Sequence, residues 1–259
     1  MSTTIILSYA LIILGIVVWA FLIPGRRHVS PKLMNYINIF GGAFLFASCF
    51  INLVPHMFLG EDPYRFVTPN LHFKIAAAVM VGFLIQLLLE RLTNGVEHGH
   101  EHLEDNHQTA QKGQHAISAL LIGLCIHAFL EGMPMVDPDG DIHQGLLYGI
   151  VLHNIPIALV LVALFMSHNY SFWRSLSLLA IFAVMTPLGS ICNLFLIPEN
   201  EMLQSLIMGV VIGILLHVSV SILFDHHHNT FSWGKLALIL MAFVAAYLTP
   251  GCPEIYGIY

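Results

Sequence analysis

The sequence predicts an all-α integral membrane protein with eight transmembrane helices, and three observations support this fold class. Of the 259 residues, 57% are hydrophobic and only 9% are Asp, Glu, Lys or Arg, whereas a soluble domain carries roughly 25% charged residues. The hydrophobic residues gather in blocks of about 15 to 27, the length that crosses a bilayer as a helix. These blocks are hydrophobic on all sides, whereas strands of a membrane barrel alternate. The chain is therefore expected to form a single transmembrane domain over residues 1–259.

Eight blocks of low charge follow one another along the chain and give the predicted helices in order. The first is expected to be a retained helix rather than a signal sequence, because it lacks a basic leader and an evident small-residue cleavage site. The third and the eighth have the shortest uncharged cores. The approximate boundaries are 3–23, 36–59, 71–91, 116–136, 144–167, 174–197, 202–224 and 234–251.

The distribution of Lys and Arg predicts how the helices are oriented. Most of the nine lie on one side of the predicted alternation, and basic residues are retained on the cytosolic side of a membrane. Both termini are therefore expected outside, and short loops favour a bacterial inner membrane. So few basic residues, with a net charge of −6, exclude nucleic acid as a partner. The predicted cytosolic set is Arg26, Arg27, Lys32, Arg91, Lys112, Arg174 and Lys235, and the outer set is Arg65 and Lys74.

Polar side chains near the predicted membrane midplane identify a candidate site. His127 and Glu131 are four residues apart in the fourth span, so they share one helix face. His153 and Asn154 lie in the fifth span, which a loop of about seven residues makes an antiparallel neighbour of the fourth. Imidazole and carboxylate suit Zn²⁺ and other divalent cations, so the sequence predicts a metal site. The alternative is a His–Glu hydrogen bond that only ties the helices together.

Helix irregularities and one further histidine accompany this site. Pro134 follows His127 and Glu131, and Pro156 follows His153, so kinks are expected where the donors lie. His217 in the seventh span lies about one turn to the cytosolic side of the midplane. Its expected role is either packing or contact with a leaving ion.

The same residues resemble the motifs of the ZIP family of divalent metal transporters. His127-Ala-Phe-Leu-Glu131-Gly132 resembles the family's His-x-x-x-Glu-Gly, and His153-Asn154-Ile155-Pro156 resembles its His-Asn/Glu-Ile-Pro. The second span, from Gly42 to His56, is similar without a gap, and Thr186-Pro187-Leu188-Gly189 stands where the family has Glu-Pro-x-Gly. Eight spans, outer termini and a His-rich cytosolic loop also agree, so the resemblance covers nearly the whole chain.

The resemblance implies a 3+2+3 helical bundle, in which spans one to three and six to eight are inverted repeats around spans four and five. It implies that Zn²⁺, or alternatively Fe²⁺, Mn²⁺ or Co²⁺, moves toward the cytosol as the substrate rather than as a resident cofactor. The implied core transport site is His127, Glu131, His153 and Asn154, and the path residues are Asn52 and His56 at the outer entrance and His217 beyond the site.

Three departures from the family's pattern bear on the number of ions. Ala128 replaces a usual polar residue after the first His, Ile157 follows the span-five motif where many members carry a ligand, and Thr186 replaces a Glu in span six. In the family these positions help to hold a second metal ion beside the first. The resemblance therefore implies that this chain holds one ion, since the second site has lost most of its donors.

A His-rich cytosolic loop is expected between the third and fourth spans, over residues 93–115. Such tracts without Cys bind Zn²⁺ or Ni²⁺ loosely and exchange it readily, which suits a receiver of delivered ions. The alternative is a polar linker without a metal role. A shorter tract at 226–228 follows the seventh span. The histidines of the loop are His98, His100, His102, His107 and His115.

Two other functions stay open. A metal sensor, or a relative that no longer transports, would bind the ion without passing it, as the missing second-site donors suggest. An intramembrane zinc-dependent hydrolase would also place His and Glu around an open zinc position, with Ser221 or Asp225 as further candidates, but the sequence has no His-Glu-x-x-His motif. No enzymatic activity is therefore expected. The expected partners are the divalent ion and the lipid bilayer, with a homodimer as the candidate assembly.

Overall fold

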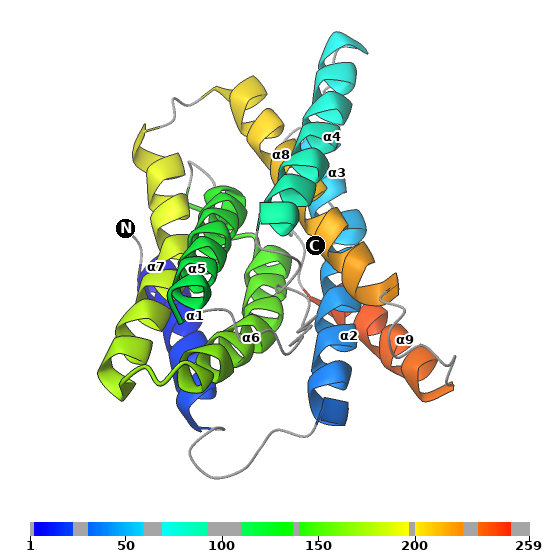
Figure 1. Ribbon diagram of the computed structural model, residues 1–259. Coiled ribbons are helices and arrows are strands. Elements are labelled where there is room, and N and C mark those ends of the chain that lie inside the picture. Colours follow the sequence, from blue (N-terminus) through cyan, green and yellow to red (C-terminus); the bar gives the residue numbers. More distant parts are fainter. Residues whose placement is uncertain are drawn as a thin grey trace.

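The described residues of the chain are almost entirely helical. The computed structural model describes residues 3–22, 31–59, 69–92, 110–136, 140–196, 200–224 and 233–249 (Figure 1). Apart from one isolated β-bridge between Val136 and Ile142, these ranges form helices and short connections, so the predicted all-helical fold is confirmed. The helices are α1 (Thr3–Leu22), α2 (Pro31–Ser48), α3 (Val54–Leu59), α4 (Pro69–Leu92), α5 (Ala110–Gly132), α6 (Gln144–Ser167), α7 (Phe172–Leu196), α8 (Glu201–Phe224) and α9 (Trp233–Leu248).

The helices follow the eight predicted spans. A π-helical turn at Cys49–Leu53 joins α2 to α3, so these three elements together form the second span. Two apolar helices are shorter over the residues described, Thr3–Val17 and Trp233–Leu248, and the second of these agrees with the short core predicted for the eighth span. The six stretches long and apolar enough to cross a membrane are Asn35–Leu53, Leu71–Arg91, Ile117–Met135, Gln144–Met166, Phe172–Phe195 and Met202–Phe224.

The fourth span begins earlier than its hydrophobic block. The sequence places its start near residue 116, whereas α5 begins at Ala110. Ala110, Gln111 and Lys112 all favour helix, so the backbone stays helical beyond the apolar segment. The last part of the expected 93–115 loop is therefore helical, and its residues 93–109 lie outside the described part of the chain.

Packing divides the helices into two groups that lie side by side (Figure 1). The first, here called the α6 group, contains α1, α5, α6 and α7, with α5 packed on α7 and α1 packed on α6. The second, the α8 group, contains α2, α4, α8 and α9, with α4 packed on α8 and α2 packed on α9. Contacts of α2 with α6 and of α4 with α5 join the two groups.

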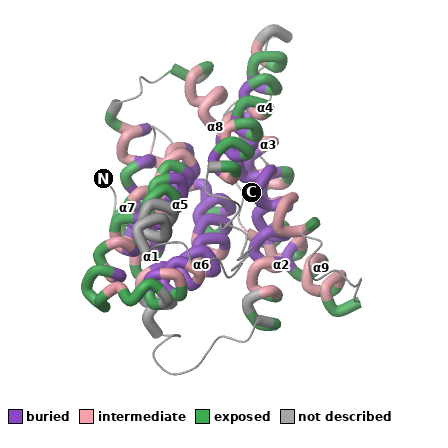
Figure 2. Tube along the Cα trace, viewed as in Figure 1, coloured by how far each residue is buried: buried purple, intermediate pink, exposed green. Residues whose placement is uncertain are grey.

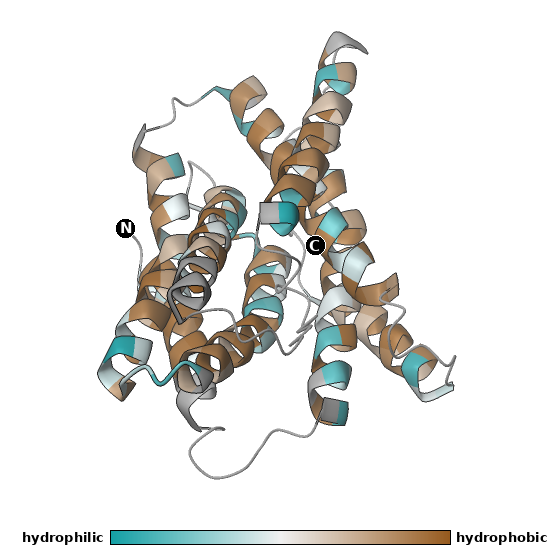
Figure 3. Ribbon diagram, in the orientation of Figure 1, coloured by the Kyte–Doolittle hydropathy of each residue, from teal (hydrophilic) through white to brown (hydrophobic). Residues whose placement is uncertain are grey.

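Burial distinguishes the helices that face lipid from those that form the core. In α6, 61% of the spanning stretch is buried, whereas in α4 only 22% is, which places α6 inside the bundle and α4 at its edge (Figure 2). Hydrophobic residues predominate along most of the helices (Figure 3). On α4, large side chains such as Phe73, Met80 and Leu88 are mostly exposed. In water such a surface would promote aggregation, whereas in a bilayer lipid covers it.

Glycines allow two pairs of helices to approach at backbone distance. A Cβ on Gly82 of α4 would overlap the Val210 carbonyl of α8, and a Cβ on Gly132 of α5 would overlap the Thr186 carbonyl of α7. Small residues of this kind let membrane helices pack through van der Waals contact where the hydrophobic effect is weak. The crossing at Gly132 matters for function, because this glycine directly follows Glu131.

We expect Gly82→Ala to destabilise the bundle by roughly 1–3 kcal/mol, because the added methyl group must push α4 away from α8. Gly15→Ala is the matched control, since its Cβ would sit 3.7 Å from Val151 Cγ1, an ordinary van der Waals contact. Thermal unfolding of the two purified variants in detergent measures the difference. Equal melting temperatures of the two variants would show that the α4–α8 crossing can accommodate a methyl group at position 82.

Candidate metal centre

Helix α5 places two of the predicted ligands together at its buried end. His127 and Glu131 both have no exposed surface, and Glu131 Oε2 lies 3.6 Å from His127 Nε2. The four-residue spacing creates this contact, since residues i and i+4 lie one above the other on a helix. Helix α5 ends one residue after Glu131, and the turn Met133–Met135 that follows contains Pro134.

Helix α6 brings the other two predicted ligands to the same region. The rings of His153 and His127 lie 5.8 Å apart between centroids and are nearly perpendicular. Asn154 is fully buried beside His153. Pro156 lies within α6 and has no N–H to donate to the carbonyl of Leu152, as the sequence predicts. The helix nevertheless continues to Ser167.

Buried polar atoms of Glu131, Asn154 and Thr186 lack hydrogen-bond partners in the described part of the chain. Among the described residues, neither carboxylate oxygen of Glu131 and neither side-chain polar atom of Asn154 has one, and the hydroxyl of Thr186 on α7 is in the same condition. Burying such groups without a partner is costly, and a carboxylate costs the most. A bound cation would satisfy the oxygens at once, so their chemistry fits a divalent metal ion.

The cluster is nonetheless more open than a complete metal site. In the part of the chain that the structure describes, no three His, Cys, Asp or Glu side chains lie close enough together to hold an ion. His127 and Glu131 form a close pair, and His153 stands beside them. Binding of an ion would therefore require the side chains to draw together.

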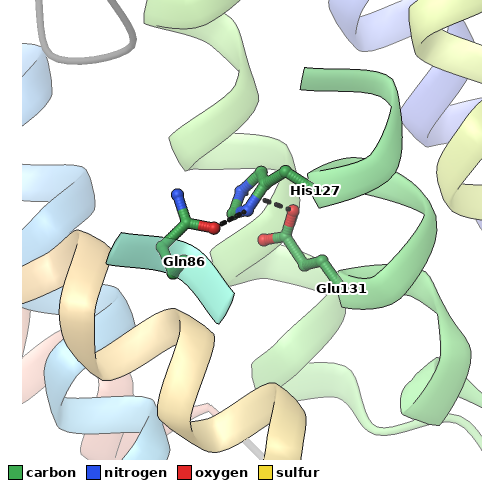
Figure 4. A network of polar contacts seen from close by, with 3 residues as sticks. All are labelled: Gln86, His127 and Glu131. Carbon is green, nitrogen blue, oxygen red and sulfur yellow. Dashed lines mark hydrogen bonds and ion pairs between the residues drawn. The ribbon is translucent and has the colours of Figure 1, made fainter. Parts of the chain in front are cut away.

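His127 forms a hydrogen bond with a glutamine that sequence reasoning missed. Gln86 of α4 is fully buried, and its Oε1 lies 2.9 Å from Nδ1 of His127 (Figure 4). This contact is a hydrogen bond that ties His127 of α5 to α4. The available signal was a single uncharged polar residue in the hydrophobic third span.

The same face of α4 carries a second residue that sequence reasoning missed. Glu90 follows Gln86 by four positions, and its Oε2 lies 3.4 Å from Nε2 of His217 on α8. The ring of Phe83 meets the His217 ring edge-on, with centroids 4.7 Å apart. His217 thus lies in a contact between α4 and α8, away from the contacts of His127.

The structure describes only some of the residues predicted to bind the ion outside the core site. Asn52 lies in the π-helical turn of the second span, and its amide occupies the space beside Gly145 of α6, where a Cβ would overlap it. Such turns often occur at functional sites. His56 lies in α3, and its side chain is outside the described residues, as is the tract with His98, His100, His102 and His107.

The three positions that depart from the family's pattern are all buried. Ala128, Ile157 and Thr186 have at most 4% exposed surface. Of the three, only Thr186 carries an oxygen. Ile157 lies four residues after His153, on the same face of α6.

The chain is similar to one known protein family. The sequence matches the model of a family described as ZIP zinc transporters over residues 94–248. The match covers α5 to α9, and therefore His127, Glu131, His153, Asn154 and His217. It leaves Asn52, Gln86 and Glu90 outside. No curated protein matches the sequence.

The burial of Glu131 leads to a test of metal binding through stability. Because its oxygens lack hydrogen-bond partners among the described residues, we expect Glu131→Gln to leave the metal-free protein as stable as before, or more stable by roughly 1–3 kcal/mol. Zn²⁺ should raise the melting temperature of the unmodified protein and not that of the variant.

Thermal unfolding with and without Zn²⁺ measures both effects. The control is Asp141→Asn, which removes an exposed carboxylate and should keep the response to Zn²⁺. An undiminished response in Glu131→Gln would exclude Glu131 as a ligand.

Proposed function

The chain belongs to the ZIP zinc transporter family, and from this premise we propose that it carries Zn²⁺, or a similar divalent cation, across the membrane into the cytosol. The ion would bind at one site between α5 and α6, formed by His127, Glu131, His153 and Asn154. Membership of a transporter family also means that the protein is not an enzyme, so the hydrolase alternative is set aside.

One observation carries the location of the site. Glu131 is fully buried in a helix that crosses the membrane, and its two oxygens have no hydrogen-bond partner among the described residues. An ionisable group at such depth is rare unless it serves function. His127 lies 3.6 Å from one of these oxygens, and the His153 ring lies beside the His127 ring. Imidazole is a ligand that Zn²⁺ accepts. A divalent cation supplies what the buried oxygens lack.

The path on either side of the site follows from helix direction. With both termini outside a bacterial inner membrane, α5 runs outward, so Glu131 lies one turn nearer the outside than His127. Asn52 and His56 would receive the ion at the outer end. His217 with its neighbour Glu90 would contact it on the cytosolic side, and the histidines of the 93–115 segment would accept it there.

The packing supports a 3+2+3 bundle with inverted repeats. Such a bundle exchanges the first span with the sixth, the second with the seventh, the third with the eighth and the fourth with the fifth. Under this exchange the α1–α6 contact becomes the α7–α5 contact, and the α4–α8 contact becomes the α9–α2 contact. These four pairs are the most extensively packed in the described part of the chain.

The burial of apolar side chains supports a single ion. Ile157 and Ala128 occupy the places where a second ion would need donors, and both are packed in the hydrophobic core. A second divalent cation placed there would have Thr186 as its new oxygen ligand, and a hydroxyl alone cannot offset the loss of hydration.

We expect His127→Ala to reduce Zn²⁺ influx to the level of protein-free liposomes, because it removes the imidazole next to Glu131. The measurement uses reconstituted protein with a fluorescent chelator inside the liposomes. His168→Ala, which alters an exposed histidine in the α6–α7 turn, should transport normally. If the unmodified protein binds Zn²⁺ but passes none, the protein is a sensor instead.

We expect Ile157→Glu to raise the number of bound Zn²⁺ ions from one toward two, since it places a carboxylate one turn from His153. Ile157→Leu keeps the side chain apolar and should still bind one. Metal content of folded protein after dialysis against Zn²⁺ gives the stoichiometry. A value that stays at one in folded Ile157→Glu would show that the second site needs more than this donor.

A further inference from the structure

The position of Gln86 is unusual for the helix on which it lies. Helix α4 is at the edge of the bundle, and most of its side chains face outward. Gln86 instead has no exposed surface, and its amide reaches across to α5. It lies 41 positions before His127 in the sequence, so the contact depends entirely on how α4 packs.

The hydrogen-bond chemistry of this contact decides where the proton of His127 lies. An amide oxygen can only accept a hydrogen bond, so Nδ1 of His127 must be the donor. Figure 4 shows the oxygen of Gln86 directed at the ring and its nitrogen directed away. In a neutral imidazole the other nitrogen, Nε2, then carries the lone pair.

Nε2 of His127 is the ring nitrogen that lies close to the carboxylate of Glu131. Nε2 of His127 lies 3.6 Å from Oε2 of Glu131, which leaves two electron-pair donors facing one another. Neither can donate a hydrogen bond to the other while Nδ1 holds the ring proton and the carboxylate is ionised. A cation between them would bind both atoms, and histidine ligands of metals commonly donate their other N–H to an oxygen in this way.

We propose that Gln86 is a positioning residue, which holds His127 in its Nδ1-protonated form and directs Nε2 toward the ion that Glu131 also binds. The inference rests on the proposed function for the identity of the ion. It adds the third span to a site that otherwise belongs to α5 and α6. It also gives His127 a polar neighbour from outside the two helices that carry the predicted ligands.

Three variants test the role of the acceptor. Gln86→Leu keeps the size of the side chain and removes the acceptor, and it should weaken Zn²⁺ binding by about 10- to 100-fold. Gln86→Glu retains an acceptor oxygen and should bind Zn²⁺ close to the unmodified level. Gln204→Leu is the matched control, because Gln204 also accepts a bond across two helices, at 3.1 Å from Asn193 Nδ2, away from His127.

Two measurements read the outcome, and neither depends on transport. Isothermal titration of the purified, metal-free protein with Zn²⁺ gives the affinity. Nitrogen-15 chemical shifts of labelled histidine, assigned by difference from His127→Ala, show which ring nitrogen carries the proton. The expected result is an Nδ1-protonated His127 in the unmodified protein and a mixture of forms in Gln86→Leu.

Either of two results would overturn the inference. One is an Nε2-protonated His127 in the unmodified protein, and the other is unchanged Zn²⁺ affinity in folded Gln86→Leu. If Gln86→Leu weakens Zn²⁺ binding but the unmodified protein shows no Zn²⁺ flux, the proposed transport function is contradicted and the role of Gln86 is supported. If the unmodified protein transports Zn²⁺ but Gln86→Leu binds it as tightly, transport is supported and the role of Gln86 is contradicted.

Discussion

A carboxylate buried among hydrophobic helices is the constraint around which this protein is organised. Glu131 has no exposed surface, and its oxygens have no hydrogen-bond partner among the described residues. Lipid offers no substitute for water, so such a group persists only where something else compensates its charge. His127 lies 3.6 Å from Glu131, and the neutral side chains of His127 and of His153 beside it carry lone pairs rather than a positive charge. The cluster is therefore complementary to a cation and poorly suited to being empty.

Close helix crossings surround Glu131 with tightly packed backbone. Gly132 follows Glu131 and lets α5 meet the backbone of α7, and Gly189 of α7 meets the Phe129 carbonyl in the same crossing. With the backbones in contact, little space remains for water beside the cluster. Thr186 lies at this crossing with its hydroxyl buried. The glycines thus contribute to the site because they have no Cβ, which lets the two helix backbones come into contact beside it.

Sequence reasoning located the helices and drew attention to the buried polar residues of α5 and α6, because lipid restricts spans to apolar helices and makes buried polar residues conspicuous. The contact between His127 and Glu131 followed from spacing alone. Gln86 and Glu90 were missed, since their partners lie on distant helices and depend on how α4 packs against α5 and α8. The π-helical turn at Cys49–Leu53 was missed for a different reason: it adds one residue to a turn without a distinctive composition. The described part of α5 already includes Ala110, so this helix extends beyond the hydrophobic block from which its start was predicted.

The hydrogen bond between Gln86 and His127 crosses the boundary between the α8 group and the α6 group. A hydrogen bond is sensitive to a relative shift of the two groups, because it weakens steeply once stretched by about 1 Å. One residue of helix rise is about 1.5 Å. A slide of one group past the other by that amount would release the imidazole from its acceptor. The affinity of the site for the ion would then depend on the relative position of the two helix groups. The movement itself would weaken ion binding, and no separate signal would be needed.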